Sequence, residues 1–362
     1  MQINPPQSDT TSSTTNTQPT AANTRIRLVA LGNGVWLDDI CRAGCEPVKN
    51  VPGGSVTFAT LGARLFAADE PSRIAMTFNA GHDFPEDIID VFRSWDIDLT
   101  IHKLHDKPSS RGLVFYEEAN NNRKGFQRLT EPLPVPIKDL KGTLSLKAQS
   151  FEFFGTAQYI EEQVADLVKL RWDKIIRHIR TEPFIVWEPH PKSCTPDTLK
   201  AHQEAAKLVD VFSPNHEELH SFFGEPVESV DTDMIEEQAR SFVKAGIGPM
   251  GEGCIVVRAA GHGCLIMARH VKSHWLPPYY PADSEKVVDA TGAGNAFLGA
   301  FAVGFCSTGS NVEAGVFGTV AASFALEQVG LPVRVGEGDE ETWNGCLVMD
   351  RVHEYRQRLK LD

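Results

Sequence analysis

The stretch Val287–Gly299 reads VVDATGAGNAFLG and decides the fold of this 362-residue chain. Two small apolar residues and a Gly-Ala-Gly turn precede a run rich in Ala, Phe and Gly, which is typical of a tight turn that opens a buried helix. Such a turn exposes backbone N–H groups at the positive end of a helix, where an anion such as a phosphoryl group binds well. Gly292 and Gly294 lack the Cβ atoms that would obstruct that approach. Taken alone, a Gly-Ala-Gly turn is more often a structural loop, so the wider pattern decides between the two interpretations.

Short apolar runs alternate with amphipathic stretches along the rest of the chain. The strand candidates include Leu28–Leu31, Ile74–Phe78, Leu113–Tyr116, Phe184–Trp187, Val209–Phe212, Ile255–Val257 and Cys264–Met267, and the helix candidates include Pro85–Trp95, Ala157–Arg180 and Thr232–Ala245. This alternation predicts an α/β fold with a mostly parallel sheet that helices cover on both faces. In such folds ligands bind beyond the carboxyl ends of the strands.

Composition excludes several classes of protein. The net charge of −13 opposes binding to nucleic acid, and we find no basic run that would offset it. The longest apolar stretch, Ala296–Cys306, is too short to span a bilayer, which needs roughly 20 residues. The seven cysteines are scattered and odd in number, so we expect reduced thiols and a cytoplasmic location. Residues 1–24 are mostly Ser, Thr, Asn, Gln and Pro, which predicts a disordered tail before one domain at 25–362.

Five motifs in a consistent order resemble the PfkB/ribokinase family of carbohydrate and nucleoside kinases. They are Leu31–Ile40, the Gly53-Gly54 pair with the following Leu61–Leu65, Pro214–Glu218, Arg258–Gly263, and Asp289–Asn295. The residues of these motifs are most similar to those of a fungal subgroup named for maintenance of killer. The resemblance implies a ribokinase-like three-layer α/β/α domain with a small β lid at about 41–52 and 99–131. The lid implies a monomer, or a homodimer formed through it.

The resemblance also assigns roles to residues. It implies ATP and Mg²⁺ as cofactors, with K⁺ as a further candidate. The resemblance assigns the anion hole to Gly292, Ala293 and Gly294, and the nucleotide contacts to Asn215, Arg258, Gly261 and Gly263. It implies that Glu218 binds Mg²⁺ through water and that Asp289, with Thr291, holds the monovalent cation. The substrate residues it implies are Asp38, Gly53 and Gly54. Asn215 and Glu218 also match a helix N-cap with its capping-box glutamate, and both roles are compatible.

Three departures from the family pattern concern catalysis. The position of the catalytic base, directly after Gly-Ala-Gly, is Asn295, which orients a hydroxyl but takes no proton. Phe58 stands at or near a sugar-binding asparagine, and Arg258 replaces a threonine of the nucleotide loop. We therefore expect a slow ATP-dependent phosphotransferase that acts on the alcohol group of a small sugar-like or nucleoside-like metabolite. The alternative is a catalytically inactive kinase-fold protein used for nucleotide binding or protein interaction.

One rival motif needs a structural test. His216–His220 matches H-E-x-x-H, which on a helix could bind zinc with Glu217 as a base. No clear third ligand follows it in the sequence. The kinase interpretation already accounts for the same residues.

Overall fold

The computed structural model describes residues 25–42, 44–116, 123–174, 182–224 and 230–361. The expected tail at 1–24 and residues 117–122 of the expected lid segment lie outside these residues. The fold described below therefore concerns the α/β domain alone.

A nine-stranded sheet forms the centre of the domain, in the order β13-β12-β11-β10-β9-β8-β1-β4-β5. Its strands are β1 (Leu28–Leu31), β4 (Ile74–Gly81), β5 (Asp98–Leu104), β8 (Ser150–Gly155), β9 (Phe184–Pro189), β10 (Val211–Phe212), β11 (Cys254–Arg258), β12 (Cys264–Ala268) and β13 (His274–Leu276). Neighbouring strands are parallel from β5 to β11, and only β12 and β13 run antiparallel to their neighbours. The prediction of a mostly parallel sheet is confirmed.

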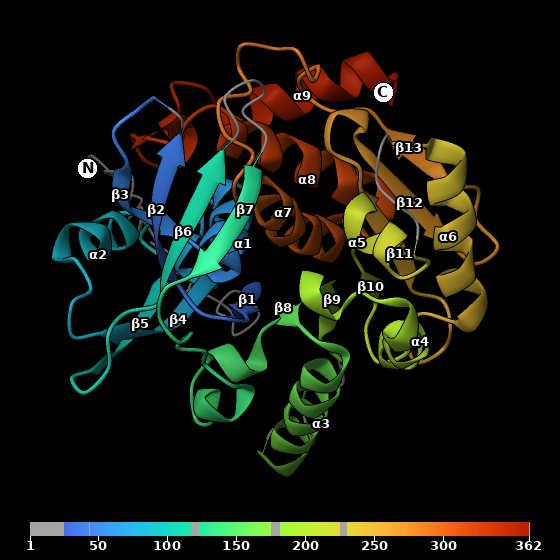
Figure 1. Cartoon of the computed structure of the whole chain (residues 1–362), viewed down its shortest axis with the longest axis horizontal. Coiled ribbons are helices and arrows are strands. Elements are labelled where there is room, and N and C mark those ends of the chain that lie inside the picture. Colours follow the sequence, from blue (N-terminus) through green and yellow to red (C-terminus); the bar gives the residue numbers. More distant parts are fainter. Residues whose placement is uncertain (1–24, 43, 117–122, 175–181, 225–229, 362) are drawn as a thin grey trace, which may run out of the picture.

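Helices cover both faces of this sheet, which confirms the three-layer architecture (Figure 1). One face carries α1 (Ser55–Leu65), α2 (Glu86–Arg93), α7 (Ala293–Thr308), α8 (Asn311–Leu326) and α9 (Val348–Leu359), and the other carries α3 (Ala157–Lys174), α4 (Leu199–Ala206), α5 (His216–Ser221) and α6 (Thr232–Ala245). Each set buries its apolar side chains in a separate core beneath its own face of the sheet. None of the described helices has both the length and the apolar character that crossing a bilayer requires.

A second, four-stranded sheet corresponds to the expected lid, with different boundaries. It has the order β3-β2-β6-β7, built from β2 (Trp36–Arg42), β3 (Val48–Gly53), β6 (Arg111–Tyr116) and β7 (Arg123–Arg128). The lid sheet therefore begins at Trp36 rather than at residue 41. Residues 99–104 belong to β5 of the central sheet, because they extend the parallel pairing with β4. Figure 1 shows β2, β6 and β7 beside α1 and α7.

Two glycine contacts hold α1 and α7 unusually close together. A Cβ atom on Gly62 would lie 1.9 Å from the carbonyl oxygen of Ala296, and one on Gly299 would lie 1.8 Å from that of Ala59. Any larger residue at either glycine would push the helices apart. The crossing brings the start of α1, which follows Gly53-Gly54, next to the Gly-Ala-Gly turn that opens α7.

A short C-terminal hairpin is tied to the core by buried charge. It consists of β14 (Arg334–Val335) and β15 (Thr342–Trp343). The carboxylate of Glu341 accepts hydrogen bonds from Arg64 of α1, at 2.8 Å for Nη1 to Oε1, and from Nε1 of Trp343 at 2.9 Å. Because Arg64 is fully buried, this ion pair locks the C-terminal segment against α1.

Candidate active site

A charged cluster lies where β9, β11 and α7 meet. Nη1 of Arg258, at the end of β11, is 2.8 Å from Oε1 of Glu188, near the end of β9. The amide of Asn295, in the first turn of α7, donates a hydrogen bond to Oε2 of Glu188. A Cβ atom on Gly294 would lie 2.3 Å from Nη1 of Arg258, so the guanidinium lies directly against the Gly-Ala-Gly turn. The structure therefore brings together three sequence-predicted residues and one, Glu188, that the sequence analysis missed.

Glu218 joins the cluster from the start of α5. Its N–H donates to Oδ1 of Asn215 and its Oε2 accepts from the N–H of Asn215, both at 2.8 Å, so the predicted capping box is present. The same Oε2 is 3.7 Å from Nη2 of Arg258. Burial is the main cause that raises the pKa of Glu218 to about 8, with Arg258 opposing the shift and Glu188 adding to it.

Glu152 is a third buried carboxyl group that the sequence analysis missed. It lies on β8 opposite Val186 of β9, two residues before Glu188. Because side chains alternate along a strand, Glu152 and Glu188 project from the same face of the sheet. Glu152 is fully buried, and within the described part of the chain neither carboxyl oxygen has a hydrogen-bond partner. Burial, reinforced by Glu188, raises the pKa of Glu152 well above its ordinary value.

The resemblance implies Mg²⁺ bound through water to Glu218, and the positive groups beside this carboxylate oppose a second cation there. The Oε2 atom of Glu218 already faces the backbone N–H of Asn215 and the guanidinium of Arg258. Mg²⁺ needs oxygen atoms at about 2.0–2.1 Å in a near-octahedral arrangement, and a neighbouring positive charge opposes its binding. The described residues contain no group of three or more His, Cys, Asp or Glu side chains placed to hold a metal ion.

The turn that opens α7, where the resemblance implies an anion hole, has a glycine conformation and an aromatic contact. Gly292 has a φ of 79°, which favours glycine, and the first N–H groups of a helix have no partner within it. A Cβ atom on Gly292 would lie 2.2 Å from the ring of Phe58, which is 1% exposed. Phe58 therefore packs directly on the turn and offers it no hydrogen bond.

The expected nucleotide loop, Arg258–Gly263, packs against the segment after β13. A Cβ atom on Gly263, whose φ is 85°, would lie 1.9 Å from the carbonyl oxygen of Leu276. One on Gly261 would lie 2.7 Å from the Cβ of Ala282. Both glycines thus have a packing reason to be glycine, independent of any ligand.

The expected substrate residues meet at the base of the lid. Asp38 of β2 is 4% exposed and lies opposite Gly112 of β6. A Cβ atom on Gly53 would lie 2.1 Å from Oδ2 of Asp38, and one on Gly112 would lie 2.5 Å from Oδ1. A Cβ atom on Gly54, the next residue in the chain, would lie 2.6 Å from the ring of Trp36. The sequence analysis missed Gly112, since a single glycine within a strand gives no ligand-specific signal.

Asp289 already has a cationic neighbour. Its Oδ1 accepts hydrogen bonds from the hydroxyl of Tyr116 and, at 2.8 Å, from the N–H of Thr291. Its Oδ2 is 3.8 Å from Nη2 of Arg42 at the end of β2. At the position where the resemblance implies a monovalent cation, a guanidinium from the lid therefore faces the carboxylate.

The H-E-x-x-H motif does not form a zinc site. The rings of His216 and His220 are 6.4 Å apart and nearly perpendicular. His220 is buried and its Nδ1 is 2.7 Å from Oε1 of Gln238, which gives it a structural partner on α6. Glu218 caps α5, as described above.

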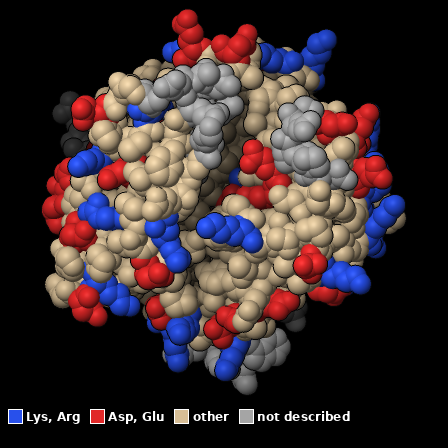
Figure 2. Space-filling view, viewed as in Figure 1, with Lys and Arg blue, Asp and Glu red and all other residues tan. Residues whose placement is uncertain are grey.

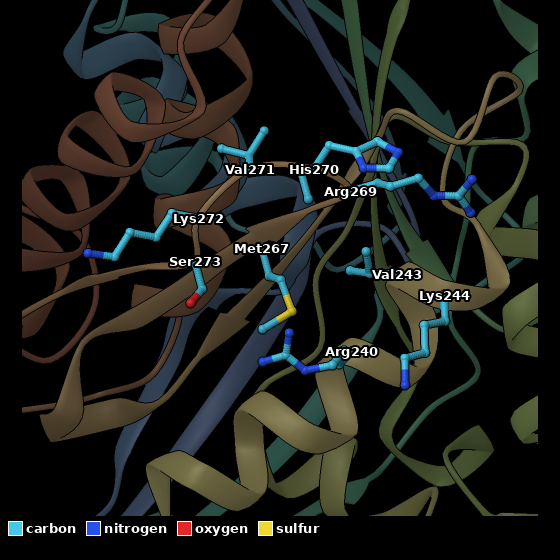
Figure 3. Close-up of a pocket in the computed structure, with 10 residues that line it drawn as sticks. Arg240, Val243, Lys244, Met267, Arg269, His270, Val271, Lys272 and Ser273 are labelled. Atoms are coloured by element: carbon cyan, nitrogen blue, oxygen red, sulfur yellow. The ribbon is translucent and has the colours of Figure 1, made fainter.

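The surface of the protein has two concave features. Figure 2 shows a hollow in the face seen in Figure 1, with acidic side chains gathered at its wall. A pocket of about 450 Å³ lies elsewhere, between α6 and the β12–β13 turn, and its basic lining is drawn in Figure 3. Because Cys254 pairs with Ala268 while Arg258 pairs with Cys264, that turn lies at the opposite end of the sheet from Arg258. The basic pocket is therefore separate from the candidate site.

Two curated fungal proteins are similar to this chain over most of its length. A protein of uncharacterized role from Schizosaccharomyces pombe is 30% identical over 341 residues, which cover 89% of this chain and 91% of that protein. The protein MAK32 of Saccharomyces cerevisiae is 28% identical over 348 residues, covering 92% and 93%. The predicted similarity to the fungal subgroup is confirmed.

Solved structures extend the likeness to the ribokinase-like fold. Ribokinase from Giardia lamblia matches with a TM-score of 0.66 at 15% identity, covering 93% of this chain and 99% of that one. An Escherichia coli ribokinase II candidate, in complex with ATP and Mg²⁺, matches with a TM-score of 0.63 at 15% identity, covering 92% and 99%. The predicted ribokinase-like fold is confirmed. Residues 44–333 match the pfkB family of carbohydrate kinases, and the chain belongs to that family.

Proposed function

We propose that this protein is an ATP-dependent phosphotransferase whose acceptor is the alcohol group of a small sugar-like or nucleoside-like metabolite. The observation that carries the proposal is the juxtaposition of Arg258, Gly294, Asn295 and Glu188. A cationic side chain and a helix N-terminus lie beside a carboxylate, which is the combination that phosphoryl transfer to a hydroxyl needs.

The transferring phosphoryl group would bind at the turn that opens α7. The N–H groups of Gly292 and Gly294 would stabilise its equatorial oxygens, and that of Ala293 would join them by leaving the carbonyl oxygen of Ala290, to which it donates at 3.3 Å. Arg258 would add a positive charge next to them. In the reaction the acceptor oxygen bonds to the γ-phosphorus, the bond from that phosphorus to the bridging oxygen breaks, and ADP leaves. Positioning and electrostatic stabilisation are the main contributions of the protein to such a step.

The proton of the acceptor hydroxyl would pass to Glu188. Asn295 occupies the position of the family base and cannot take a proton, but its amide holds the carboxylate of Glu188 at hydrogen-bond distance. Burial raises the pKa of Glu188, against the opposing effects of Arg258 and Asn295, and a more basic carboxylate accepts a proton more readily. The ion pair with Arg258 weakens this basicity, so we expect slow turnover.

The acceptor would enter from the lid. Asp38, buried between Gly53 and Gly112, would accept hydrogen bonds from its hydroxyl groups. Phe58, which is buried against Gly292, offers the acceptor no hydrogen bond at the position of the family asparagine. The monovalent cation considered from the resemblance is not needed in this scheme, because Arg42 faces Asp289.

A second candidate function follows from the same residues. If Arg258 keeps Glu188 neutralised throughout, the protein binds nucleotide without transferring phosphate. The test is incubation of the protein with ATP and a panel of sugars and nucleosides, with mass spectrometry of the products. We expect a monophosphorylated product from at least one acceptor, and its loss in Asp38→Asn with nucleotide binding retained. Nucleotide binding with no phosphorylated product from any acceptor would favour the second candidate.

A further inference from the structure

We propose that the guanidinium of Arg258 replaces the divalent metal at this site, so that the protein binds the phosphates of a nucleoside triphosphate without Mg²⁺. The inference rests on the proposed nucleotide site and adds to it the identity of the cation. It concerns a residue that the family pattern does not place there, since Arg258 stands where the family has threonine.

The guanidinium is fixed by partners from three segments. Nη1 is 2.8 Å from Oε1 of Glu188, Nη2 donates to the carbonyl oxygen of Ser213 at 2.9 Å, and the same Nη2 is 3.7 Å from Oε2 of Glu218. The Arg258 side chain is only 12% exposed. An arginine held in this way is part of a built site and not a surface side chain that happens to point inward.

The position of the guanidinium relative to α7 matches that of a phosphate ligand. Because Nη1 of Arg258 would be 2.3 Å from a Cβ on Gly294, a phosphate bound to the N–H groups of the turn would lie within reach of the guanidinium. Arginine binds phosphate through paired hydrogen bonds and keeps its charge at any physiological pH. Arg258 thus contacts carboxylates on one side and faces the phosphate position on the other, which is the bridging arrangement that a metal would provide.

The positions of the acidic residues suit one cation, the guanidinium of Arg258, and not a metal ion beside it. Glu188 and Glu218 both face Arg258, and Glu152 behind them is fully buried without a hydrogen-bond partner among the described residues. The Oε2 atom of Glu218 already accepts a hydrogen bond from the N–H of Asn215 at 2.8 Å. A divalent ion beside Glu218 would also lie close to the guanidinium and be repelled by it.

A second arginine, Arg42, also lies against a carboxylate, on the other side of the turn. Arg42 faces Asp289, three residues before Gly292, and its Nη2 also donates to the carbonyl oxygen of Val288 at 3.0 Å. The segment Val288–Asn295 therefore has a protein-borne cation at each end. This observation comes from the lid and is independent of the contacts of Arg258.

Calorimetric titration of ATP tests the proposal in the full-length protein, once with Mg²⁺ and once with EDTA. We expect wild type to bind with affinities that agree within about threefold. Arg258→Thr, which restores the residue type of the family, should lose about tenfold or more in EDTA, because a charge-assisted contact is removed, and should recover with Mg²⁺. Arg240→Thr, on α6 in the separate basic pocket, is the matched control and should behave as wild type.

The outcomes separate the two proposals. Wild-type binding that requires Mg²⁺ would overturn the role of Arg258 and leave the nucleotide site standing. Equal affinities of wild type and a folded Arg258→Thr variant in EDTA would also overturn it. If wild type bound ATP under neither condition, the proposed function itself would fail. Since the wild-type comparison alone is decisive, the test does not depend on the variant being stable.

Discussion

Asn295 and Glu188 are joined by a hydrogen bond from the amide of the first to the carboxylate of the second. The α7 position where the resemblance implies a base is thus neutral, and the carboxylate beside it comes from the end of β9. Together the two residues place an amide and a carboxylate at this point of the site. The amide comes from α7 and the carboxylate from β9.

Moving the carboxylate back to α7 should restore activity lost by removing it from β9. Glu188→Gln should lower phosphotransfer by about 10²–10⁴-fold, the usual contribution of a general base. Glu188→Gln combined with Asn295→Asp should exceed that single variant by about tenfold or more, because the new carboxylate on α7 would lie beside a neutral amide on β9. Coupled assays of ADP release with an acceptor from the panel would measure both rates.

The control for this pair is the remote substitution Glu252→Gln, at an exposed position before β11, which should leave the rate unchanged. A double variant no faster than Glu188→Gln alone, with ATP affinity preserved, would show that proton transfer does not occur at this pair.

Glu152 should make folding stability fall as the pH rises. The folded state raises the pKa of Glu152 well above its ordinary value of 4.5, so above that pH the folded protein holds a proton that the unfolded chain has released. Each pH unit in this window costs up to about 1.4 kcal/mol of stability. Glu152→Gln removes the titrating group, so urea denaturation between about pH 5 and about pH 8 should show a flatter pH dependence.

Glu252→Gln again serves as the comparison, because it makes the same substitution at an exposed position. A Glu152→Gln variant with the same pH slope as wild type would mean that Glu152 ionises in the folded protein much as it does in the unfolded chain.

The sequence predicted the architecture and the segments of the site better than the contacts within it. The Gly-Ala-Gly turn and the Asn215–Glu218 capping box could be found because each is a local pattern with a conformational cause. Glu152 and Glu188 gave no such signal, since each is a single acid within an apolar strand. The ion pair of Glu188 with Arg258 and the place of Glu152 beside Glu188 depend on strand order, which brings together residues far apart in the chain.

The boundaries of the lid also could not be predicted from the sequence. Residues 99–104 could be assigned to either sheet from their composition, because a polar strand at the edge of the central sheet resembles a lid strand. Parallel pairing with β4 decides that they form β5 of the central sheet.

The ion pair between Arg64 and Glu341 should be a major contributor to stability. Glu341 also accepts hydrogen bonds from Trp343 and Arg334, so Glu341→Gln leaves buried Arg64 without a counter-charge. Breaking a buried pair by removing one partner costs about 3–5 kcal/mol. Chemical denaturation should show this loss, and Glu340→Gln, at the exposed neighbouring position, should be close to wild type. A change below about 1 kcal/mol for Glu341→Gln would mean that the pair is solvated.

Nucleotide binding should be insensitive to potassium. Because Arg42 faces Asp289 at 3.8 Å, the carboxylate has a cationic neighbour without a bound ion. Replacing K⁺ by Na⁺ at constant ionic strength should change the ATP affinity of wild type by less than about twofold, since the general screening of charge is the same for both salts. Arg42→Ala should weaken binding and make it depend on K⁺. A strong dependence on K⁺ in wild type would contradict the assignment of Arg42.

The most direct measurement is the binding of ATP to Gly294→Asp by calorimetry, alongside wild type. The substitution places a carboxylate at the first turn of α7, where it would pair with Arg258 and repel phosphate. The nearest atom is Nη1 of Arg258, which would have to move from its place beside Glu188, so the melting temperature of the variant is measured together with its ATP affinity. Ser310→Asp, which adds a carboxylate at the N-cap of α8, is the matched control. The nucleotide site as described predicts that wild type and Ser310→Asp bind ATP and that Gly294→Asp loses about tenfold or more of the affinity. Equal binding by Gly294→Asp and wild type, or no binding by wild type, would contradict it.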